Sequence, residues 1–473
     1  MNSHDKHRNL LALLALLAAA LVLHLRVLGL SFLSDDLTIL YRIGVLDQVG
    51  TGSFFRPLPD WTHWLNYKLA GPRPWAFRLV NVLLLGFNGW LLAQVMNRLS
   101  AHLTLASSAA WWAAVLFVAY PFHQEPQVWI VGRSTAMATA AVLLAVHVAL
   151  GTRALRGRVI GVALCTFIGT LCYEHALLIP GLLIVLWTML PSRKDAHWWP
   201  MVASSSAIVF LNLALRAWTG GQVANAYGSG FFQRPWTNYL GSATKVIGRL
   251  FLPPRPDADV QAWCFLALGL VLAALLLVAW RRRGSAEWRA VLALLALTAV
   301  SAAVAVVGGV STRTSESDRF LYLPAAFLCA AVAVGLSTVG RFRLPALLGL
   351  VVLCMLAQWK GHSHWVTASS TLERIISATP TAEPGARVFI SGLPGDHRGA
   401  YILRHGYQEA LLFAGRDTTG LVWVDTVLTE QRDTRGLLAI RHGTSGDTLH
   451  LRSQDRAVRW IGTRFEEEVR PHH

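Results

Sequence analysis

Two adjacent aspartates, Asp35 and Asp36, follow the first apolar run of the chain, which covers about residues 9–30. A carboxylate just beyond such a run meets water without a large desolvation cost, and an unperturbed Asp has a pKa of about 3.9. At least one of the two is therefore expected to be ionised at neutral pH and able to accept a proton from a substrate. The alternative is structural, because Ser34 or Asp35 would also suit the N-cap of the helix that follows.

A second group of candidate residues comprises His123, Glu125 and Arg133, in a stretch where Pro121 and Pro126 predict a rigid turn. A charged residue at the edge of an apolar run often extends to the membrane interface, and this explains Arg133 well. It explains Glu125 less well, because apolar residues resume soon after it. His123 and Glu125 could together hold a divalent metal, although two candidate ligands do not define a metal site.

Two further charged motifs stand at the ends of apolar runs. Glu174 and His175 lie between two runs with almost no loop to hold them, so they are candidates either for function or for stabilising a tight turn. Asp318, Arg319 and Tyr322 stand at the start of another run. Arg319 could bind a phosphate through two parallel hydrogen bonds. Alternatively, Asp318 and Arg319 anchor the interface, with Tyr322 in an aromatic belt.

Membrane helices are the elements that must position these residues. Of the 473 residues, 54% are hydrophobic and 14% charged, and the mean hydropathy is +0.45. A soluble protein carries about a quarter charged residues, so this composition indicates a lipid environment. An all-α polytopic membrane protein with about eleven transmembrane helices is therefore predicted. The apolar runs begin near residues 9, 76, 105, 134, 159, 176, 201, 262, 290, 320 and 344.

The formal charge of +16 lies entirely in the first 360 residues, because residues 361–473 contain 13 Arg, no Lys and 13 Asp plus Glu. The excess falls in short clusters at every second connection between apolar runs, as the positive-inside rule expects of cytoplasmic loops. This predicts a cytoplasmic N-terminus and an extracytoplasmic C-terminus, and it does not suit a nucleic-acid site. The clusters are Arg98; Arg153, Arg156 and Arg158; Arg193 and Lys194; Arg281, Arg282 and Arg283; and Arg341 and Arg343.

Two domains are expected, a multi-pass membrane domain over residues 1–360 and a small mixed α/β extracytoplasmic domain over residues 361–473. Two of the predicted outer loops are long, the first at 31–75 and the fourth at 218–261. The candidate residues all fall in outer connections, so acids and bases gather on one face of the membrane. The five cysteines lie in or beside apolar runs, with no disulfide or zinc-ligand spacing.

The tail itself mixes patterns of both kinds. Strand-like runs occur at 387–391 and 420–427, a helical pattern spans about 400–413, and a hairpin is predicted at 437–451 with its turn at 443–446.

Taken together, these motifs resemble the GT-C superfamily of glycosyltransferases that use polyprenyl-phosphate sugars. The acidic pair Asp35–Asp36 resembles the N-terminal part of that superfamily, and so do Phe55–Leu58 and Arg78–Leu84. More closely, the chain resembles the membrane part of the TMTC-type protein O-mannosyltransferases, over roughly residues 10–360. Those similarities lie at Pro121–Glu125, Val131–Arg133, Tyr173–Glu174 and Asp318–Pro324. The chain departs from that family after the membrane part, where tetratricopeptide repeats are absent.

The resemblance implies a donor made of a sugar on a polyprenyl phosphate and an acceptor hydroxyl on a glycan, lipid or protein. Asp35 or Asp36 would act as the general base of an inverting transfer on the extracytoplasmic face. Arg56, Arg133 and Arg319 would bind the donor phosphate, where negative charge grows in the transition state. His123, Glu125, Glu174, His175, Asp318 and Tyr322 would support the acceptor, a metal or the structure. No cofactor is certain, and a divalent metal is one option.

Three other functions are compatible with parts of the pattern. A transporter or lipid-linked-glycan flippase would place charges in mid-span or break its helices in matching halves, whereas here the charges stand at the ends of mostly clean runs. An envelope-glycan ligase would use the same face and the same arginines. A catalytically inactive scaffold would not need acids in two loops. The five cysteines in or beside apolar runs and the plain first apolar run suit the inner membrane of a bacterium.

Overall fold

The computed structural model describes residues 3–50, 55–103, 108–152, 154–190, 197–219, 235–281, 285–424, 426–432, 438–442, 447–450 and 454–469. The chain divides into two compact units. Unit 1 contains residues 1–29 and 47–362, and unit 2 contains residues 30–46 and 363–473. The predicted first outer loop is therefore divided between the units, and its aspartates belong to unit 2.

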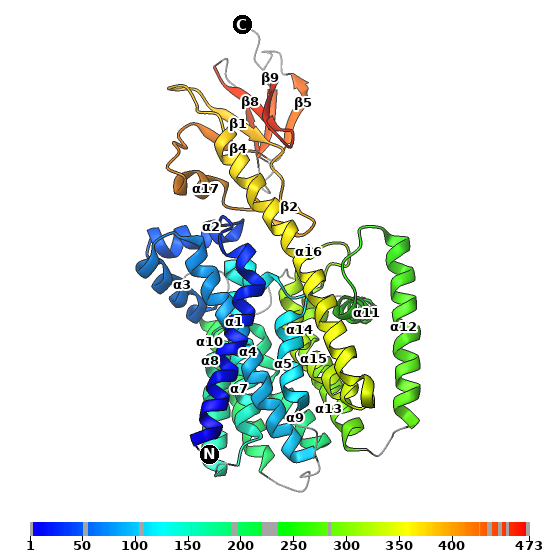
Figure 1. The fold of residues 1–473 in the computed structure, drawn as a ribbon. Coiled ribbons are helices and arrows are strands. Elements are labelled where there is room, and N and C mark those ends of the chain that lie inside the picture. The colour runs from blue at the N-terminus through cyan, green and yellow to red at the C-terminus, as the bar shows by residue number, and fades with distance from the viewer. Residues whose placement is uncertain are drawn as a thin grey trace. The chain divides into compact units, whose positions relative to one another are not determined.

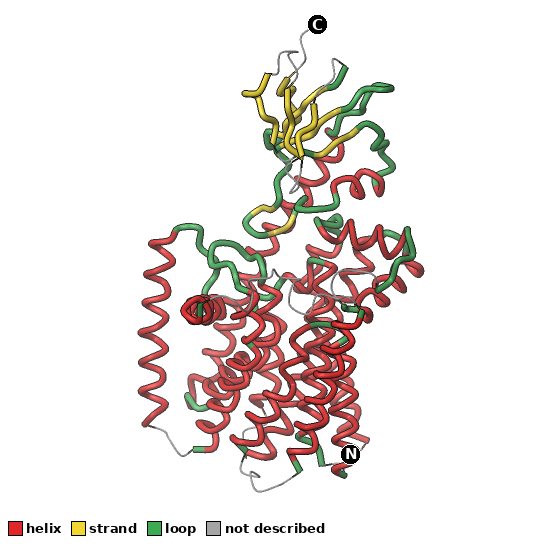
Figure 2. The backbone as a smooth tube through the Cα atoms, turned by 180° about the vertical axis from the view of Figure 1, so that it is seen from behind, coloured by secondary structure: helices red, strands yellow, loops and turns green. Residues whose placement is uncertain are grey.

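Unit 1 is a bundle of helices, as predicted, and Figures 1 and 2 show most of them running side by side. Runs of apolar residues favour helices in lipid, because a helix satisfies every backbone polar group within itself. The helices are α1 (Ser3–Leu28), α3 (Pro57–Ala70), α4 (Pro74–Leu103), α5 (Ser108–Ala119), α6 (Glu125–Val128), α7 (Arg133–Ala149), α8 (Leu155–Thr170), α9 (Ile179–Met189), α10 (Trp198–Trp218), α11 (Trp236–Phe251), α12 (Ala258–Arg281), α13 (Ala286–Ser301), α14 (Ala303–Gly308), α15 (Tyr322–Ser337) and the first part of α16 (Arg343–Ala378).

Short 3-10 turns precede several of these helices, and three of them carry or adjoin candidate residues. They are Ile130–Gly132 before α7, Glu174–Leu178 before α9 and Asp318–Leu321 before α15.

Every predicted apolar run overlaps a helix of the described residues. Within the described part of the chain, seven helices are long and apolar enough to cross a membrane by themselves, and shorter apolar helices account for other runs. The prediction of an all-α polytopic fold is confirmed. Of the basic clusters, Arg153, Arg193, Lys194, Arg282 and Arg283 lie outside the described residues.

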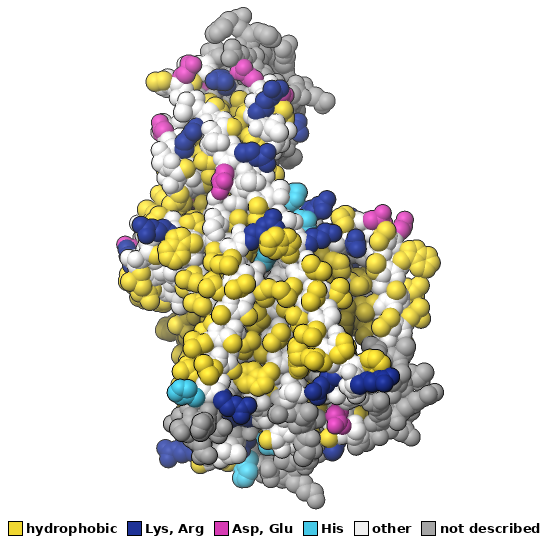
Figure 3. All heavy atoms as spheres, viewed as in Figure 1, with side chains coloured by type: hydrophobic (Ala, Val, Ile, Leu, Met, Phe, Trp, Pro, Cys, Tyr) yellow, Lys and Arg dark blue, Asp and Glu magenta, His cyan; other side chains and the backbone are white. Residues whose placement is uncertain are grey.

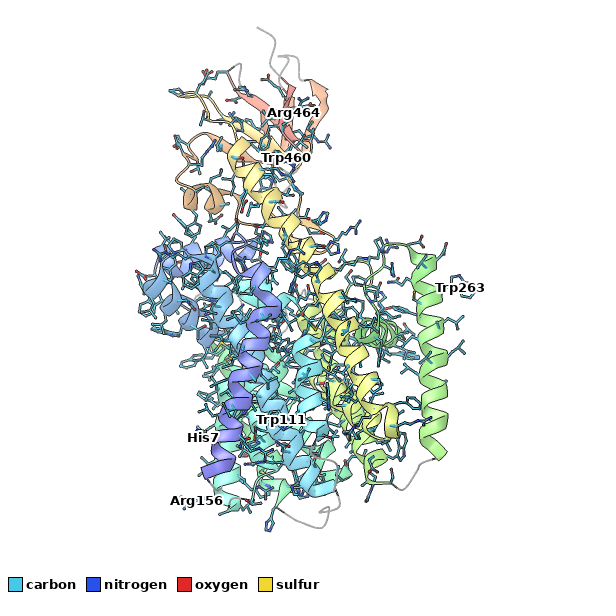
Figure 4. All side chains as sticks on the ribbon, viewed as in Figure 1. His7, Trp111, Arg156, Trp263, Trp460 and Arg464 are labelled. Atoms are coloured by element: carbon cyan, nitrogen blue, oxygen red, sulfur yellow. The ribbon has the colours of Figure 1, made fainter. Side chains whose placement is uncertain are left out.

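The surface of unit 1 agrees with a lipid environment. Figure 3 shows apolar side chains covering the middle of the visible face of the helices, with Lys and Arg side chains above and below them. Trp263 on α12 is largely exposed and lies on the side facing away from the other helices (Figure 4). His7 on α1 and Arg156 on α8 lie at the same end of the bundle, where the sequence places cytoplasmic connections (Figure 4).

Close helix packing in unit 1 depends on small residues. A Cβ atom added to Gly86 of α4 would lie only 2.8 Å from the Leu17 Cα atom and 2.9 Å from the Leu16 carbonyl oxygen of α1. Helices in lipid associate through such small-residue contacts, because apolar burial alone does not distinguish a neighbouring helix from lipid.

Unit 2 is the mixed α/β fold that the sequence predicts for its tail. In its main sheet, β1 (Val388–Ser391) is parallel to β4 (Leu421–Trp423) and to β8 (Arg456–Trp460), and β9 (Phe465–Val469) pairs antiparallel with β8. A second sheet contains β5 (Thr426–Arg432), β6 (Leu438–His442) and β7 (Asp447–His450). The predicted hairpin is the β6–β7 pair, and its turn lies outside the described residues.

The helical pattern at 400–413 is only half right. α17 covers Tyr407–Phe413, whereas β3 (Ala400–Tyr401) pairs with β2 (Asp396–His397). Gly406 has φ +84, a left-handed conformation that interrupts a helix and starts α17 afresh. The 30–46 segment of unit 2 adds α2 (Asp35–Leu40) and a π-helical turn at Tyr41–Val45.

Candidate active site

Asp35 and Asp36 begin α2, directly after a residue with an unusual backbone. Ser34 has φ 49 and ψ −122, a backbone conformation that residues other than glycine rarely adopt. Such conformations persist where the surroundings enforce them, and they cluster at functional sites. Ser34 occupies the N-cap position of α2, but its side chain makes no capping hydrogen bond.

The two carboxylates differ in their surroundings. Asp36 is buried, and its Oδ2 atom accepts a hydrogen bond of 3.3 Å from the Leu33 N–H group. Asp35 is half-buried, and its Oδ1 atom accepts a hydrogen bond of 3.4 Å from the Ser34 hydroxyl. Asp36 thus ties the turn together, while Asp35 keeps access to solvent.

In unit 1, Glu174 lies between two arginines. Its Oε2 atom accepts a hydrogen bond of 2.7 Å from Arg56 Nη2, and its Oε1 atom accepts one of 3.1 Å from Arg216 Nη1. Arg56 precedes α3 and its guanidinium lies 4.2 Å from the Tyr173 ring centre, whereas Arg216 is in the last turn of α10. Two guanidinium groups therefore meet at one carboxylate.

A second ion pair joins Glu125 to Arg319. The Glu125 carboxylate accepts hydrogen bonds from the Arg319 backbone N–H at 2.7 Å and from Arg319 Nη1 at 2.9 Å. The Glu125 side chain is fully buried, and Arg319 retains 19% exposure. The guanidinium also lies near the rings of Trp129 and Phe320, at 5.2 and 4.8 Å. This pair is neutral as a whole and fixes the start of α15 against α6.

A third pair, between Asp318 and Arg249, lies beside the second. Arg249 Nη2 donates to Asp318 Oδ1, and Arg249 Nε donates to the Ser311 carbonyl at 3.0 Å. Both side chains are buried. Ser317, which precedes Asp318, has a left-handed backbone with φ 70, as Ser34 does before Asp35.

Arg133 is held as a structural cation. Its Nε atom donates to Asn81 Oδ1 at 2.8 Å, its Nη1 atom to Asn66 and Thr62, and its Nη2 atom to the Phe77 carbonyl at 2.9 Å. The residue is fully buried, and among the described residues its partners are neutral groups. These bonds tie α7 to α3 and α4.

His123 and Tyr322 pack against each other. Their ring centres lie 4.7 Å apart in a stacked arrangement, and Phe117 and Tyr120 contact the His123 ring edge-on. Burial lowers the pKa of His123 to about 3. Across the described residues, no group of three or more His, Cys, Asp or Glu side chains could hold a metal. Tyr322 accepts a hydrogen bond from Asn88 Nδ2 at 3.1 Å.

His175 connects two of the ion-paired groups. Its Nε2 atom lies 3.3 Å from the Phe320 carbonyl oxygen, and its ring stacks on Tyr173 at 5.2 Å. The Glu174 group and the Arg319 pair therefore share one buried neighbourhood in unit 1. Most predicted site residues of unit 1 meet there, whereas Asp35 and Asp36 belong to unit 2.

Two arginines of this neighbourhood were not among the residues singled out from the sequence. Arg216 is the only charged residue in the apolar run of α10, and that isolation is the signal that could have identified it. Arg249 lies on the amphipathic helix α11, and the sequence gives no comparable signal for it, because cations are common on the polar face of such a helix.

No protein family and no curated protein matches the chain. Among solved structures, the chain is similar to ArnT from Cupriavidus metallidurans bound to undecaprenyl phosphate, with 13% identity, a TM-score of 0.48, and 87% of this chain and 86% of that chain covered. It is also similar to ArnT from the same organism in the apo state, with 13% identity, a TM-score of 0.42, and coverage of 90% and 87%. At 13% identity and with TM-scores below 0.5, this likeness says nothing about the residues of the site.

Proposed function

We propose that the chain is a membrane glycosyltransferase that moves a sugar from a polyprenyl-phosphate donor to an acceptor hydroxyl. The observation that carries this proposal is the meeting of two arginines, Arg56 and Arg216, at the Glu174 carboxylate among apolar helices. Guanidinium groups among apolar helices suit an anion whose own tail is a hydrocarbon. A polyprenyl phosphate has that combination of charge and tail.

Arg56 is the preferred ligand of the donor phosphate. Its side chain retains 16% exposure, and the guanidinium offers a planar fork that matches two phosphate oxygens. Arg319 is a secondary candidate, because Glu125 already neutralises it. Arg133 is the weakest of the three arginines that the sequence suggests, because it is fully buried and donates to neutral groups.

Asp35 is the proposed general base, and Asp36 positions it. The Asp35 carboxylate removes the proton of the acceptor hydroxyl while that oxygen forms a bond to the anomeric carbon. The bond between the anomeric carbon and the phosphate oxygen breaks, and polyprenyl phosphate leaves with the electron pair. Inversion at the anomeric carbon follows. Charge grows on the phosphate as the bond breaks, so the arginine stabilises the transition state more than the ground state.

The remaining features of the proposal come from the sequence. The transfer takes place on the extracytoplasmic face, with the N-terminus in the cytoplasm and the C-terminus outside, in the inner membrane of a bacterium. The acceptor hydroxyl belongs to a glycan, a lipid or a protein.

The proposal is tested on the purified full chain in liposomes with a panel of radiolabelled undecaprenyl-phosphate sugars. Arg56→Gln is the test variant, because Glu174 keeps Arg216 as its partner when Arg56 is lost. Arg464→Gln is the control, because Arg464 is an exposed residue of unit 2 that pairs with Glu466. We expect the wild type and the control to consume at least one donor, and Arg56→Gln to lower turnover by about 100-fold.

Two results would contradict the proposal. In the first, the wild type consumes no donor of the panel. In the second, Arg56→Gln matches Arg464→Gln in turnover and in donor affinity.

A further inference from the structure

The segment that carries Asp35 and Asp36 is built into unit 2, although most of that unit is the C-terminal tail. The Ser31 N–H donates to Ser369 Oγ at 2.9 Å, across 338 residues of sequence. The Ser31 hydroxyl donates to Glu373 at 2.6 Å, which fixes the segment to the end of α16. The segment therefore reaches its position through contacts made by the tail.

The backbone next to the aspartates is bonded to the tail as well. The Ser34 N–H donates to the Ile402 carbonyl at 2.9 Å, and Ser34 is the residue with the left-handed backbone before α2. Ser34 is also buried. A bond from the tail thus fixes the peptide group that sets the direction of Asp35.

Gly406 lies against the first turn of α2. A Cβ atom added to Gly406 would lie 2.9 Å from the Ser34 carbonyl oxygen, 2.9 Å from the Leu37 Cβ atom and 3.1 Å from Thr38 Oγ1. Real Cβ atoms essentially never approach other atoms so closely, and the nearest of these atoms belong to the backbone or to its first side-chain carbon. A side chain at 406 must therefore displace the start of α2.

The other end of α17 also contacts the segment. The Phe413 ring centre lies 6.3 Å from the Phe32 ring and 6.2 Å from the Tyr41 ring, the latter edge-on. Aromatic pairs at these distances are favourable. Gly406 and Phe413 together make α17 a support that touches residues on both sides of Asp35 and Asp36.

We infer that the C-terminal unit is a positioning element for the general base, and that Gly406 is its central positioning residue. This inference rests on the proposed function and extends it to the role of the tail. Gly406 touches no substrate. It acts through α2, because only a residue without a side chain lets the first turn of α2 approach the 402–406 turn this closely.

The chain offers a matched control for this inference. Gly406 and Gly415 flank α17, and both have left-handed backbones, with φ +84 and +67. A Cβ atom at Gly415 would meet nothing within 4 Å. Gly406→Ala and Gly415→Ala therefore carry a similar backbone strain, but only Gly406→Ala pushes on α2.

The experiment compares both variants with the wild type in reconstituted donor turnover and in hydrogen exchange of the amides of residues 34–40. We expect Gly406→Ala to lower kcat at least tenfold with a donor KM within twofold of wild type, and to raise exchange in residues 34–40. Gly415→Ala keeps the kcat and the exchange of the wild type. If Gly406→Ala does not fold, Phe413→Leu replaces it, with the same direction of change.

Equal kcat values for Gly406→Ala and Gly415→Ala would overturn the inference, whatever the exchange shows. Failure of the proposed function is recognised separately, because Asp35→Asn would then turn over the donor as the wild type does. A fall in kcat for Gly406→Ala with a matching rise in donor KM would also count against positioning, because it would indicate a general loss of the site.

Discussion

At the scale of the residue, the arginines of unit 1 differ in what balances their charge. Arg319 pairs with Glu125, and Arg249 pairs with Asp318. Arg133 donates to neutral groups, and Arg56 shares Glu174 with Arg216. Removing one member of a buried one-to-one pair leaves a bare charge and costs about 3–5 kcal/mol. Loss of Arg56 is less damaging to the fold, because Arg216 remains. This is why Arg56 is the arginine in which function and stability can be separated.

His123 gives a prediction about pH. In the folded chain its pKa is lowered to about 3 by burial, whereas an unfolded His titrates near 6.5. Between these values the unfolded state binds a proton that the folded state does not, so stability falls as the pH falls below about 6.5. At pH 5 this costs the wild type about 2 kcal/mol. His123→Phe keeps an aromatic ring in the stack and removes that cost.

Thermal unfolding in detergent at pH 7.5 and pH 5 measures the effect. The difference in the free energy of unfolding between His123→Phe and wild type shifts in favour of the variant at pH 5, by about 2 kcal/mol. His405→Phe, at an exposed position, serves as control. A difference that is the same at both pH values would show that His123 does not titrate as the structure implies.

At the scale of the element, α1 and α4 depend on Gly86. An alanine there pushes its Cβ atom into the Leu16–Leu17 backbone of α1, and overpacking of this kind costs about 1–3 kcal/mol. Gly349→Ala on α16 is the control, because a Cβ atom there meets nothing within 4 Å. Alanine favours a helix over glycine by about 1 kcal/mol, so the control is neutral or stabilising.

The measurement is thermal unfolding of both variants in the same detergent. Gly86→Ala unfolds at a lower temperature than the wild type, while Gly349→Ala does not. If the two variants unfold together, α1 and α4 do not pack as closely as described.

The helices of unit 1 were predictable from the sequence because a hydrophobic run in lipid has few alternatives to a helix. The start of α17 was not predictable, because the helical periodicity of residues 400–413 continues through Gly406. There the left-handed conformation of one glycine and the pairing of β2 with β3 override the local pattern. Tertiary contacts decide such short elements.

At the scale of the whole molecule, the candidate residues were predictable one by one, but their pairing was not. Glu125 and Arg319 are 194 residues apart, and Arg56 and Glu174 are 118 apart. Single-sequence patterns carry no information on which helix ends meet. For the same reason the sequence did not assign the 30–46 segment to the unit formed by the tail.

Asp35 is the proposed base, and Asp36 serves the structure around it. The most direct measurement is single-turnover transfer from a radiolabelled undecaprenyl-phosphate sugar in liposomes, with donor binding measured in parallel. Asp35→Asn is predicted to bind the donor as the wild type does and to lower the transfer rate by about 100-fold or more. Asp36→Asn is predicted to lose less activity at 25 °C and more stability. An Asp35→Asn variant that transfers the sugar at the wild-type rate would show that Asp35 is not the base.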